Sequence, residues 1–294
     1  MWNSIRNILV TITILSIIPV TATGQNEAPE SWAQFEAEGG GTLQIYYYEE
    51  PLFAYKDSTG ELTGIAVDVA RKFIQYVEKT RNVDIDPKFV KATPFPRFYN
   101  TVKNSNEAVL GVGSVTITEE RKKNVDFSTS FFVNKAVLLT HPDLPAVKNI
   151  QELSNLISGK KMLVYEGTTQ EDYFERIKTA YKADIKMDYV QSDQEILDAV
   201  SSNKNIFGCV DLPVLIQAIK SGIDVRYQPR ADIKGEDFGF ITPKNSGLKQ
   251  LLNEFFEIGY GFKSSKIYSD IVSKHLGNNL DSFLKLAENP DLRN

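Results

Sequence analysis

The chain has 294 residues, with 33 Lys and Arg against 38 Asp and Glu, two histidines and one cysteine. Its length suffices for one large or two smaller domains, and 42% hydrophobic with 24% charged residues is a globular composition. A net charge of −5 argues against nucleic-acid binding, while the single Cys209 and the distant His141 and His275 leave no disulfide and no zinc cluster. We therefore expect a mildly acidic protein with no metal, no cofactor and no nucleic-acid partner.

The first 24 residues have the layout of a secretory signal peptide. One basic residue, Arg6, precedes thirteen mostly apolar residues at 8–20, and small residues follow Pro19. The apolar run is shorter than the roughly 20 residues of a membrane-spanning helix, although an uncleaved anchor helix is the alternative. We therefore predict a signal peptide at 1–24 and a soluble protein of the periplasm or cell envelope.

Beyond a polar N-terminal segment at 25–41, strand-like and helix-like patterns alternate. The predicted strands are 43–48, 85–90, 109–115, 131–140, 161–165, 185–190, 206–210, 225–227 and 238–242. The predicted helices are 64–78, 97–103, 118–123, 170–181, 193–201, 213–220, 248–260 and 264–275. This alternation predicts an α/β protein with mainly parallel sheets, and the two series of elements suggest two lobes.

The residues just after each strand are the first candidates for function, because ligands of open α/β sheets bind beyond the carboxyl ends of the strands. After the strand 109–115, Thr118 is a good helix N-cap and Arg121 presents a guanidinium that suits a carboxylate. A solvated surface arginine is the alternative. After the strand 206–210, Asp211 suits an ammonium group, or it only caps the next helix.

Two further segments offer polar or aromatic groups. Thr168 and Glu171 form a capping box after the strand 161–165, where exposed N–H groups suit an anion. Phe95 and Arg97 offer an aromatic face and a second guanidinium at the start of a helix. For both segments, a purely structural role is the alternative.

Taken in order, these segments resemble extracytoplasmic solute-binding proteins of family 3, the amino-acid-binding type of ABC importers. The resemblance covers nearly all of residues 42–276, and its motifs are PLFAYKD from Pro51, GELTGIAVD from Gly60, TITEERKK from Thr116, VDFS from Val125 and EGTTQ from Glu166. It implies a two-lobed periplasmic-binding-protein-like fold of type II, with two hinge strands. Lobe 1 would comprise 42–138 plus 238–276 and lobe 2 139–237, with a C-terminal tail at 277–294.

The resemblance also implies roles for single residues. Arg121 would clamp the α-carboxylate of the ligand. Ser114, Thr116 and Thr169 would help it by hydrogen bonding. Asp211 would hold the α-ammonium group.

Departures from the family pattern fall where the ligand side chain would lie. Glu50 stands where many members carry an aromatic residue, and Phe95 replaces a Trp in a segment that ends in Arg97. Phe95 or Phe53 would stack on the ligand. Thr168, Arg97 and Glu50 complete the candidate ligand-binding residues. The identity of the ligand is therefore left open.

Three functions are consistent with these patterns. The first is a monomeric binding protein that captures an amino acid or similar small carboxylate-bearing solute and delivers it to an inner-membrane ABC permease. The second is an enzyme on the same scaffold, resembling cyclohexadienyl dehydratases, with Glu50, Glu166 or Asp211 as its acid or base. The third is a soluble ligand-sensing subunit of a membrane receptor.

Overall fold

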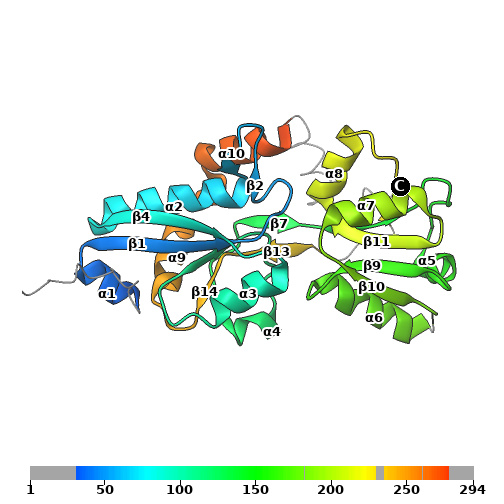
Figure 1. Ribbon diagram of the computed structural model, residues 1–294, viewed down its shortest axis with the longest axis horizontal. Coiled ribbons are helices and arrows are strands. Elements are labelled where there is room, and N and C mark those ends of the chain that lie inside the picture. The colour runs from blue at the N-terminus through cyan, green and yellow to red at the C-terminus, as the bar shows by residue number, and fades with distance from the viewer. Residues whose placement is uncertain (1–30, 182, 230–234, 260, 278–294) are drawn as a thin grey trace, which may run out of the picture.

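The computed structural model describes residues 31–181, 183–229, 235–259 and 261–277, which form two α/β lobes side by side (Figure 1). The predicted signal peptide at 1–24 and all but the first residue of the predicted tail at 277–294 lie outside these residues. Among the described helices, none combines the length and the apolar character that a membrane span requires.

Lobe 1 is built on a five-stranded sheet in the order β4-β1-β5-β14-β6. Its strands are β1 (Gly40–Tyr47), β4 (Asp84–Lys91), β5 (Leu110–Val112), β6 (Val125–Phe127) and β14 (Ile241–Pro243). The strand β1 runs parallel to β4 and β5, whereas β14 runs antiparallel to β5 and β6. The other elements of this lobe are α1 (Trp32–Ala37), the β2–β3 hairpin (Tyr55–Lys56 and Leu62–Thr63), α2 (Ile65–Arg81), α3 (Phe95–Lys103), α4 (Glu119–Lys122), α9 (Leu248–Glu257), the 3-10 helix η2 (Phe262–Ser264) and α10 (Lys266–Leu276).

Lobe 2 has a second five-stranded sheet, in the order β10-β9-β11-β8-β12. Its strands are β8 (Ala136–Thr140), β9 (Lys161–Tyr165), β10 (Lys186–Val190), β11 (Ile206–Asp211) and β12 (Arg226–Tyr227). β9, β10 and β11 are parallel, and β8 runs antiparallel to β11. The helices are α5 (Ile150–Ile157), α6 (Thr169–Tyr181), α7 (Asp193–Ser202) and α8 (Leu212–Lys220).

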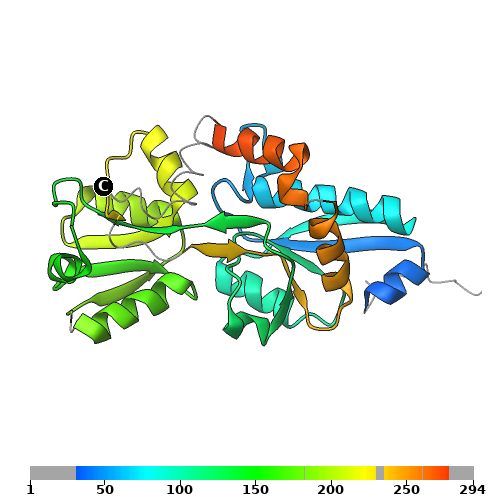
Figure 2. The same cartoon turned by 180° about the vertical axis from the view of Figure 1, so that it is seen from behind.

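Two short antiparallel strands carry the chain between the lobes, as both views show (Figures 1 and 2). They are β7 (Phe132–Asn134) and β13 (Glu236–Phe238), with Phe132 opposite Phe238 and Asn134 opposite Glu236. The two-lobed α/β fold with two hinge strands that the resemblance implied is confirmed, but the sheets are mixed and not mainly parallel, because β14 and β8 each run antiparallel to both of their neighbours.

Helical periodicity correctly identified the buried face of α2. The predicted core positions Val67, Ala70, Phe73, Ile74 and Val77 are all buried. Burial of a large apolar side chain contributes about 1.5–3 kcal/mol, so this one face accounts for much of the attachment of α2 to the sheet. The spacing of apolar residues with a period of 3.6 thus correctly predicted both that this segment is a helix and which of its faces is buried.

Several predicted boundaries are wrong. The expected strand 131–140 is two strands, because Lys135 interrupts it, and Ala136 pairs with Asp211 in the second sheet. Residues 136–138, which we placed in lobe 1, therefore belong to lobe 2. The segment 25–41, predicted to be only polar, contains α1, whose Trp32 and Phe35 are buried. The β2–β3 hairpin, β6 and η2 were not predicted, because each is too short to show a period. The helix α5 was missed although Asn149 caps it and Leu153 and Ile157 are buried at helical spacing.

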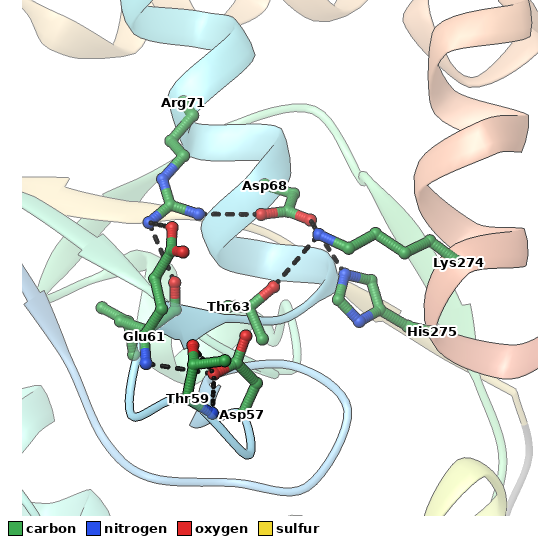
Figure 3. Close-up of polar contacts among 9 residues, drawn as sticks. Asp57, Thr59, Glu61, Thr63, Asp68, Arg71, Lys274 and His275 are labelled. Atoms are coloured by element: carbon green, nitrogen blue, oxygen red, sulfur yellow. Dashed lines mark hydrogen bonds and ion pairs between the residues drawn. The ribbon is translucent and has the colours of Figure 1, made fainter.

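A polar cluster joins α10 to α2 on the outside of lobe 1 (Figure 3). The Asp68 carboxylate accepts from Lys274 Nζ at 2.7 Å and from Arg71 Nη1 at 3.0 Å, and lies 2.9 Å from His275 Nε2. Burial raises the pKa of Asp68, but the hydrogen bonds from His275 and Lys274 outweigh burial and lower it to about 2. The Tyr55 hydroxyl lies 3.1 Å from the other nitrogen of His275, so α10 is fixed to the β2–β3 hairpin as well as to α2.

The Asp57 carboxylate holds the turn of the β2–β3 hairpin in the same view (Figure 3). It accepts from the Thr59 backbone N–H at 2.8 Å, from the Thr59 hydroxyl at 2.7 Å and from the Glu61 backbone N–H at 3.1 Å. Asp57 and Asp68 end two of the motifs that carried the family resemblance. Their contacts show that these parts of the motifs maintain the fold and do not line the cleft described next.

Candidate ligand-binding site

A cleft lies between the two lobes, and residues from both lobes and from the second hinge strand line it. Among the described residues, its lining is Tyr48, Glu50, Phe95, Ser114, Thr116 and Arg121 from lobe 1, Tyr165, Thr168, Thr169, Gln170, Asp193, Cys209 and Asp211 from lobe 2, and Glu236 and Phe238 from β13. Most of these residues follow the carboxyl end of a parallel strand, as the sequence predicted.

Arg121 is positioned by the short helix α4. The predicted N-cap Thr118 accepts from the Arg121 backbone N–H at 3.1 Å, which confirms the cap. The guanidinium donates to the Thr116 carbonyl at 3.0 Å and, across the cleft, to the Gly167 carbonyl at 2.9 Å. These bonds use two of the five N–H donors of the guanidinium. The guanidinium also lies over the ring of Phe95, 5.1 Å from its centroid, and burial lowers the pKa of Arg121.

Glu236 occupies the position between the hydroxyl groups that we expected around a ligand carboxylate. Its carboxylate accepts from Thr116 of lobe 1 at 3.3 Å and forms a short hydrogen bond with the Thr169 hydroxyl of lobe 2. Burial raises the pKa of Glu236, although these bonds and the charge of Arg121 oppose that rise. The arrangement shows that hydroxyls from both lobes converge on a carboxylate here.

Asp211 lies at the N-cap position of α8, but its side chain makes no capping hydrogen bond. The carboxylate instead accepts from the Asn134 amide at 2.7 Å and lines the cleft. Of the two roles that the sequence left open, the structure therefore favours the cleft over the helix cap. Burial, followed by the charges of Glu50 and Glu236, raises the pKa of Asp211 well above its ordinary value.

Glu50 forms a second buried carboxylate site in lobe 1. The Ser114 hydroxyl lies 2.6 Å from both of its oxygens, and the Tyr48 hydroxyl lies 2.6 Å from Ser114. Gly113 allows this arrangement, because a Cβ there would lie only 2.6 Å from the Tyr48 ring. The Ser114 hydroxyl thus contacts the Glu50 carboxylate in this structure, whereas we expected Ser114 to contact the carboxylate of the ligand.

The pKa values of the lining acids reflect their burial. Burial and the charge of Asp193 raise the pKa of Glu50 to about 8, and burial raises the pKa of Asp193 to about 6. Only 7% of the Glu50 surface is exposed. Groups of like charge in a shared cleft disfavour each other's ionised forms, so the cleft favours ligands that bring positive charge.

Two predicted site residues lie outside the cleft. Phe53 is fully buried and packs edge-on against Phe132 and Phe238 in the core where the hinge strands begin, so it cannot stack on a ligand in the cleft. Arg97 is exposed on α3, because the helical period turns it away from the buried face of Phe95 and Phe98. The other eight predicted residues line the cleft: Glu50, Phe95, Ser114, Thr116, Arg121, Thr168, Thr169 and Asp211.

Seven lining residues were not among the predicted site residues: Tyr48, Tyr165, Gln170, Asp193, Cys209, Glu236 and Phe238. A signal was present for Asp193, because it follows β10 directly after the N-cap Ser192, which accepts from the Glu195 N–H at 3.3 Å. We interpreted that segment only as a cap. Glu236 had no local signal, because its place depends on the pairing of β13 with β7.

The family model of the bacterial extracellular solute-binding proteins, family 3, matches residues 43–278. The chain belongs to this family. The match covers both sheets, both hinge strands and every lining residue of the cleft. The resemblance that the sequence motifs indicated is therefore confirmed.

Individual relatives agree with this assignment. The chain is 28% identical over 131 residues to the glutamine-binding protein of Geobacillus stearothermophilus, covering 44% of this chain and 47% of that one. It is 28% identical over 234 residues to the arginine-binding periplasmic protein of Mannheimia haemolytica, covering 77% and 87%. The solved structure of an ancestral arginine-binding protein bound to arginine superposes with a TM-score of 0.66 at 24% identity, over 81% of this chain and 100% of the other. For the first curated relatives, the match spans less than half of their length.

Proposed function

We propose that this family 3 protein captures an amino acid or a similar small carboxylate-bearing solute between its lobes and delivers it to an ABC importer in the cell envelope. Arg121 would bind the α-carboxylate, with Thr116 and Thr169 as hydroxyl donors, and Asp211 would bind the α-ammonium. The observation that carries the proposal is that donors from both lobes converge beside Arg121, where they already hold the carboxylate of Glu236. Such a site suits a ligand that links the lobes as they close.

Contacts between the lobes support closure as the binding step. The Tyr165 hydroxyl of lobe 2 accepts from the Phe95 backbone N–H of lobe 1 at 3.3 Å, and Arg121 reaches Gly167. On the outer side, Lys220 of α8 donates to the Leu276 carbonyl of α10 at 3.3 Å. Contacts of this kind exclude water from the cleft and strengthen each charged interaction within it.

The test is isothermal titration of the purified protein with a panel of L-amino acids, followed by the same titrations of Arg121→Ala. Loss of the clamp is expected to weaken binding at least about 30-fold, because the ligand carboxylate is left without its charged partner. Arg97→Ala is the matched control, since it removes an exposed arginine outside the cleft, and its affinity is expected to equal that of wild type. Unchanged affinity of Arg121→Ala would refute the clamp.

A lyase on the same scaffold is the second candidate, and one observation favours it. Because burial and the charge of Asp193 raise the pKa of Glu50 to about 8, this carboxyl retains a proton at neutral pH and has the property of a general acid. Incubation with prephenate or arogenate, followed by chromatography, separates the two functions. Conversion that disappears in Glu50→Gln would support the lyase, and recovery of the unaltered compound would support binding alone.

A further inference from the structure

The charges that line the cleft do not balance. The described lining contains four carboxyl groups, Glu50, Asp193, Asp211 and Glu236, and one guanidinium, Arg121. In the proposed binding mode, Arg121 meets the ligand carboxylate with Glu236 beside it, and Asp211 meets the α-ammonium. Two carboxyls then remain, and among the described residues neither forms an ion pair with a Lys, Arg or His side chain.

A second observation points to a ligand that donates hydrogen bonds. Gln170 lines the cleft and is 9% exposed, and its side-chain Oε1 has no hydrogen-bond partner among the described residues. A buried acceptor without a donor costs about 1–3 kcal/mol, so such atoms are rare unless they serve a ligand. An N–H group of a bound solute would satisfy it.

The arrangement of the acidic side chains in the cleft argues against a metal ion as the cation that pairs with Glu50 and Asp193. Within the part of the chain that the structure describes, no three His, Cys, Asp or Glu side chains are arranged to hold a metal. The half-buried ring of Tyr165 lines the same cleft, and aromatic rings bind organic cations through their faces. An extended organic cation therefore fits this lining better than a compact ion.

We propose that the solute is a basic α-amino acid, whose cationic side chain is bound by the carboxylates of Glu50 and Asp193. This inference rests on the proposed function and adds the class of its substrate. The hydroxyl of Ser114 holds the Glu50 carboxylate in place, and the Ser192 cap fixes the start of the helix from which Asp193 lines the cleft, so both residues are placed before a ligand arrives. Preorganised carboxylates of this kind select a charged side chain over a neutral one of the same shape.

The experiment is calorimetric titration of the full chain with L-arginine, L-citrulline and agmatine. Citrulline keeps the carboxylate and the shape of arginine without the side-chain charge, and agmatine keeps the charge without the carboxylate. Arginine is expected to bind at least about 30-fold more tightly than citrulline, because only the side chain of arginine forms ion pairs with the ionised forms of Glu50 and Asp193. Equal affinity for arginine and citrulline would overturn the inference and leave the proposed function intact. Equal affinity for arginine and agmatine would overturn the carboxylate clamp of the proposed function and leave only the binding of the cationic side chain by Glu50 and Asp193 supported.

Two variants test whether Glu50 and Asp193 are the residues that select arginine over citrulline. Glu50→Gln and Asp193→Asn are each expected to lower the ratio of arginine to citrulline affinity at least about fivefold. Both replacements are neutral and isosteric, and because burial already disfavours the charged forms, we expect both variants to fold. The matched controls, Glu49→Gln and Asp198→Asn, replace exposed acids on the same segments and should keep the wild-type ratio. An unchanged ratio in both cleft variants, or no binding of any of the three probes to wild type, would overturn the inference.

Discussion

The Arg121 cluster (Arg121, Thr116, Thr169 and Glu236) and the Glu50 cluster (Glu50, Ser114 and Asp193) balance their buried charges in different ways. In the Arg121 cluster, a guanidinium and two hydroxyls compensate one carboxylate. In the Glu50 cluster, the hydroxyl groups of Ser114 and Tyr48 lie beside the carboxyl, but no cation among the described residues pairs with it, and burial and the charge of Asp193 raise the pKa of Glu50 to about 8. The first cluster is satisfied by protein groups, whereas the second is completed only by a proton or a cation. Removing a carboxylate charge from one cluster is therefore expected to change the affinity for a basic amino acid in the opposite direction from removing one from the other cluster.

The largest expected effect is on stability as a function of pH. The unfolded chain loses the Glu50 proton near pH 4.5, whereas the folded chain keeps it to about pH 8. Between these values the folded state binds more protons, so the contribution of Glu50 to the free energy of unfolding falls as pH rises, by about 1.4 kcal/mol per pH unit. Urea unfolding at pH 5, 6, 7 and 8 measures this slope, and Glu50→Gln is expected to reduce it.

Asp211, Glu236 and Asp193 also have raised pKa values, so part of the slope will persist in that variant. The control is Glu49→Gln, in which an exposed acid is neutralised. Identical slopes in wild type and Glu50→Gln would contradict the charge difference between the clusters.

The next effect concerns Glu236, whose replacement should change affinity in the direction opposite to that of Glu50. Glu236→Gln keeps a hydrogen-bonding side chain between Thr116 and Thr169 but removes the negative charge beside the ligand carboxylate. Like charges in close contact oppose binding, so we expect affinity for arginine and citrulline to rise about tenfold. Calorimetry with both amino acids measures this change. Weaker binding of both would show that the Glu236 carboxylate helps to hold the ligand.

The smallest expected effect is that of replacing the N-cap residue of the helix next to each cluster. Thr118 caps α4, which carries Arg121, and Ser192 caps α7, which begins at Asp193. Replacing either with Ala is expected to lower the free energy of unfolding by about 1 kcal/mol. Thr118→Ala should weaken arginine and citrulline binding alike, whereas Ser192→Ala should lower mainly the affinity for arginine. The same change of selectivity in both variants would mean that the clusters do not act separately.

Local sequence patterns predicted many of the helices and strands of this protein, because helical period and N-caps depend on residues that are close together in the chain. The helical period located α2 and its buried face, and the cap at Thr118 correctly placed the start of α4. Motif order along the chain identified the family, although Asp57 and Asp68 proved to hold the hairpin and the C-terminal helix. Phe53 was misassigned, because an aromatic residue in a loop gives no local sign of whether it faces the core or a ligand.

The sequence by itself determined the alternation of strands and helices and the presence of Arg121 and Asp211 at strand ends, because each depends on residues a few positions apart, and the order of its motifs implied the two-lobed fold. Only the tertiary structure decided that Glu50, Asp193 and Glu236 share one cleft with them. These acids are far apart in the chain. Glu50 was a predicted site residue and Asp193 follows a strand, but no local pattern brings these two residues and Glu236 together. Their burial, their raised pKa values and the charge that they demand of a ligand arise only when the two lobes and the second hinge strand come together.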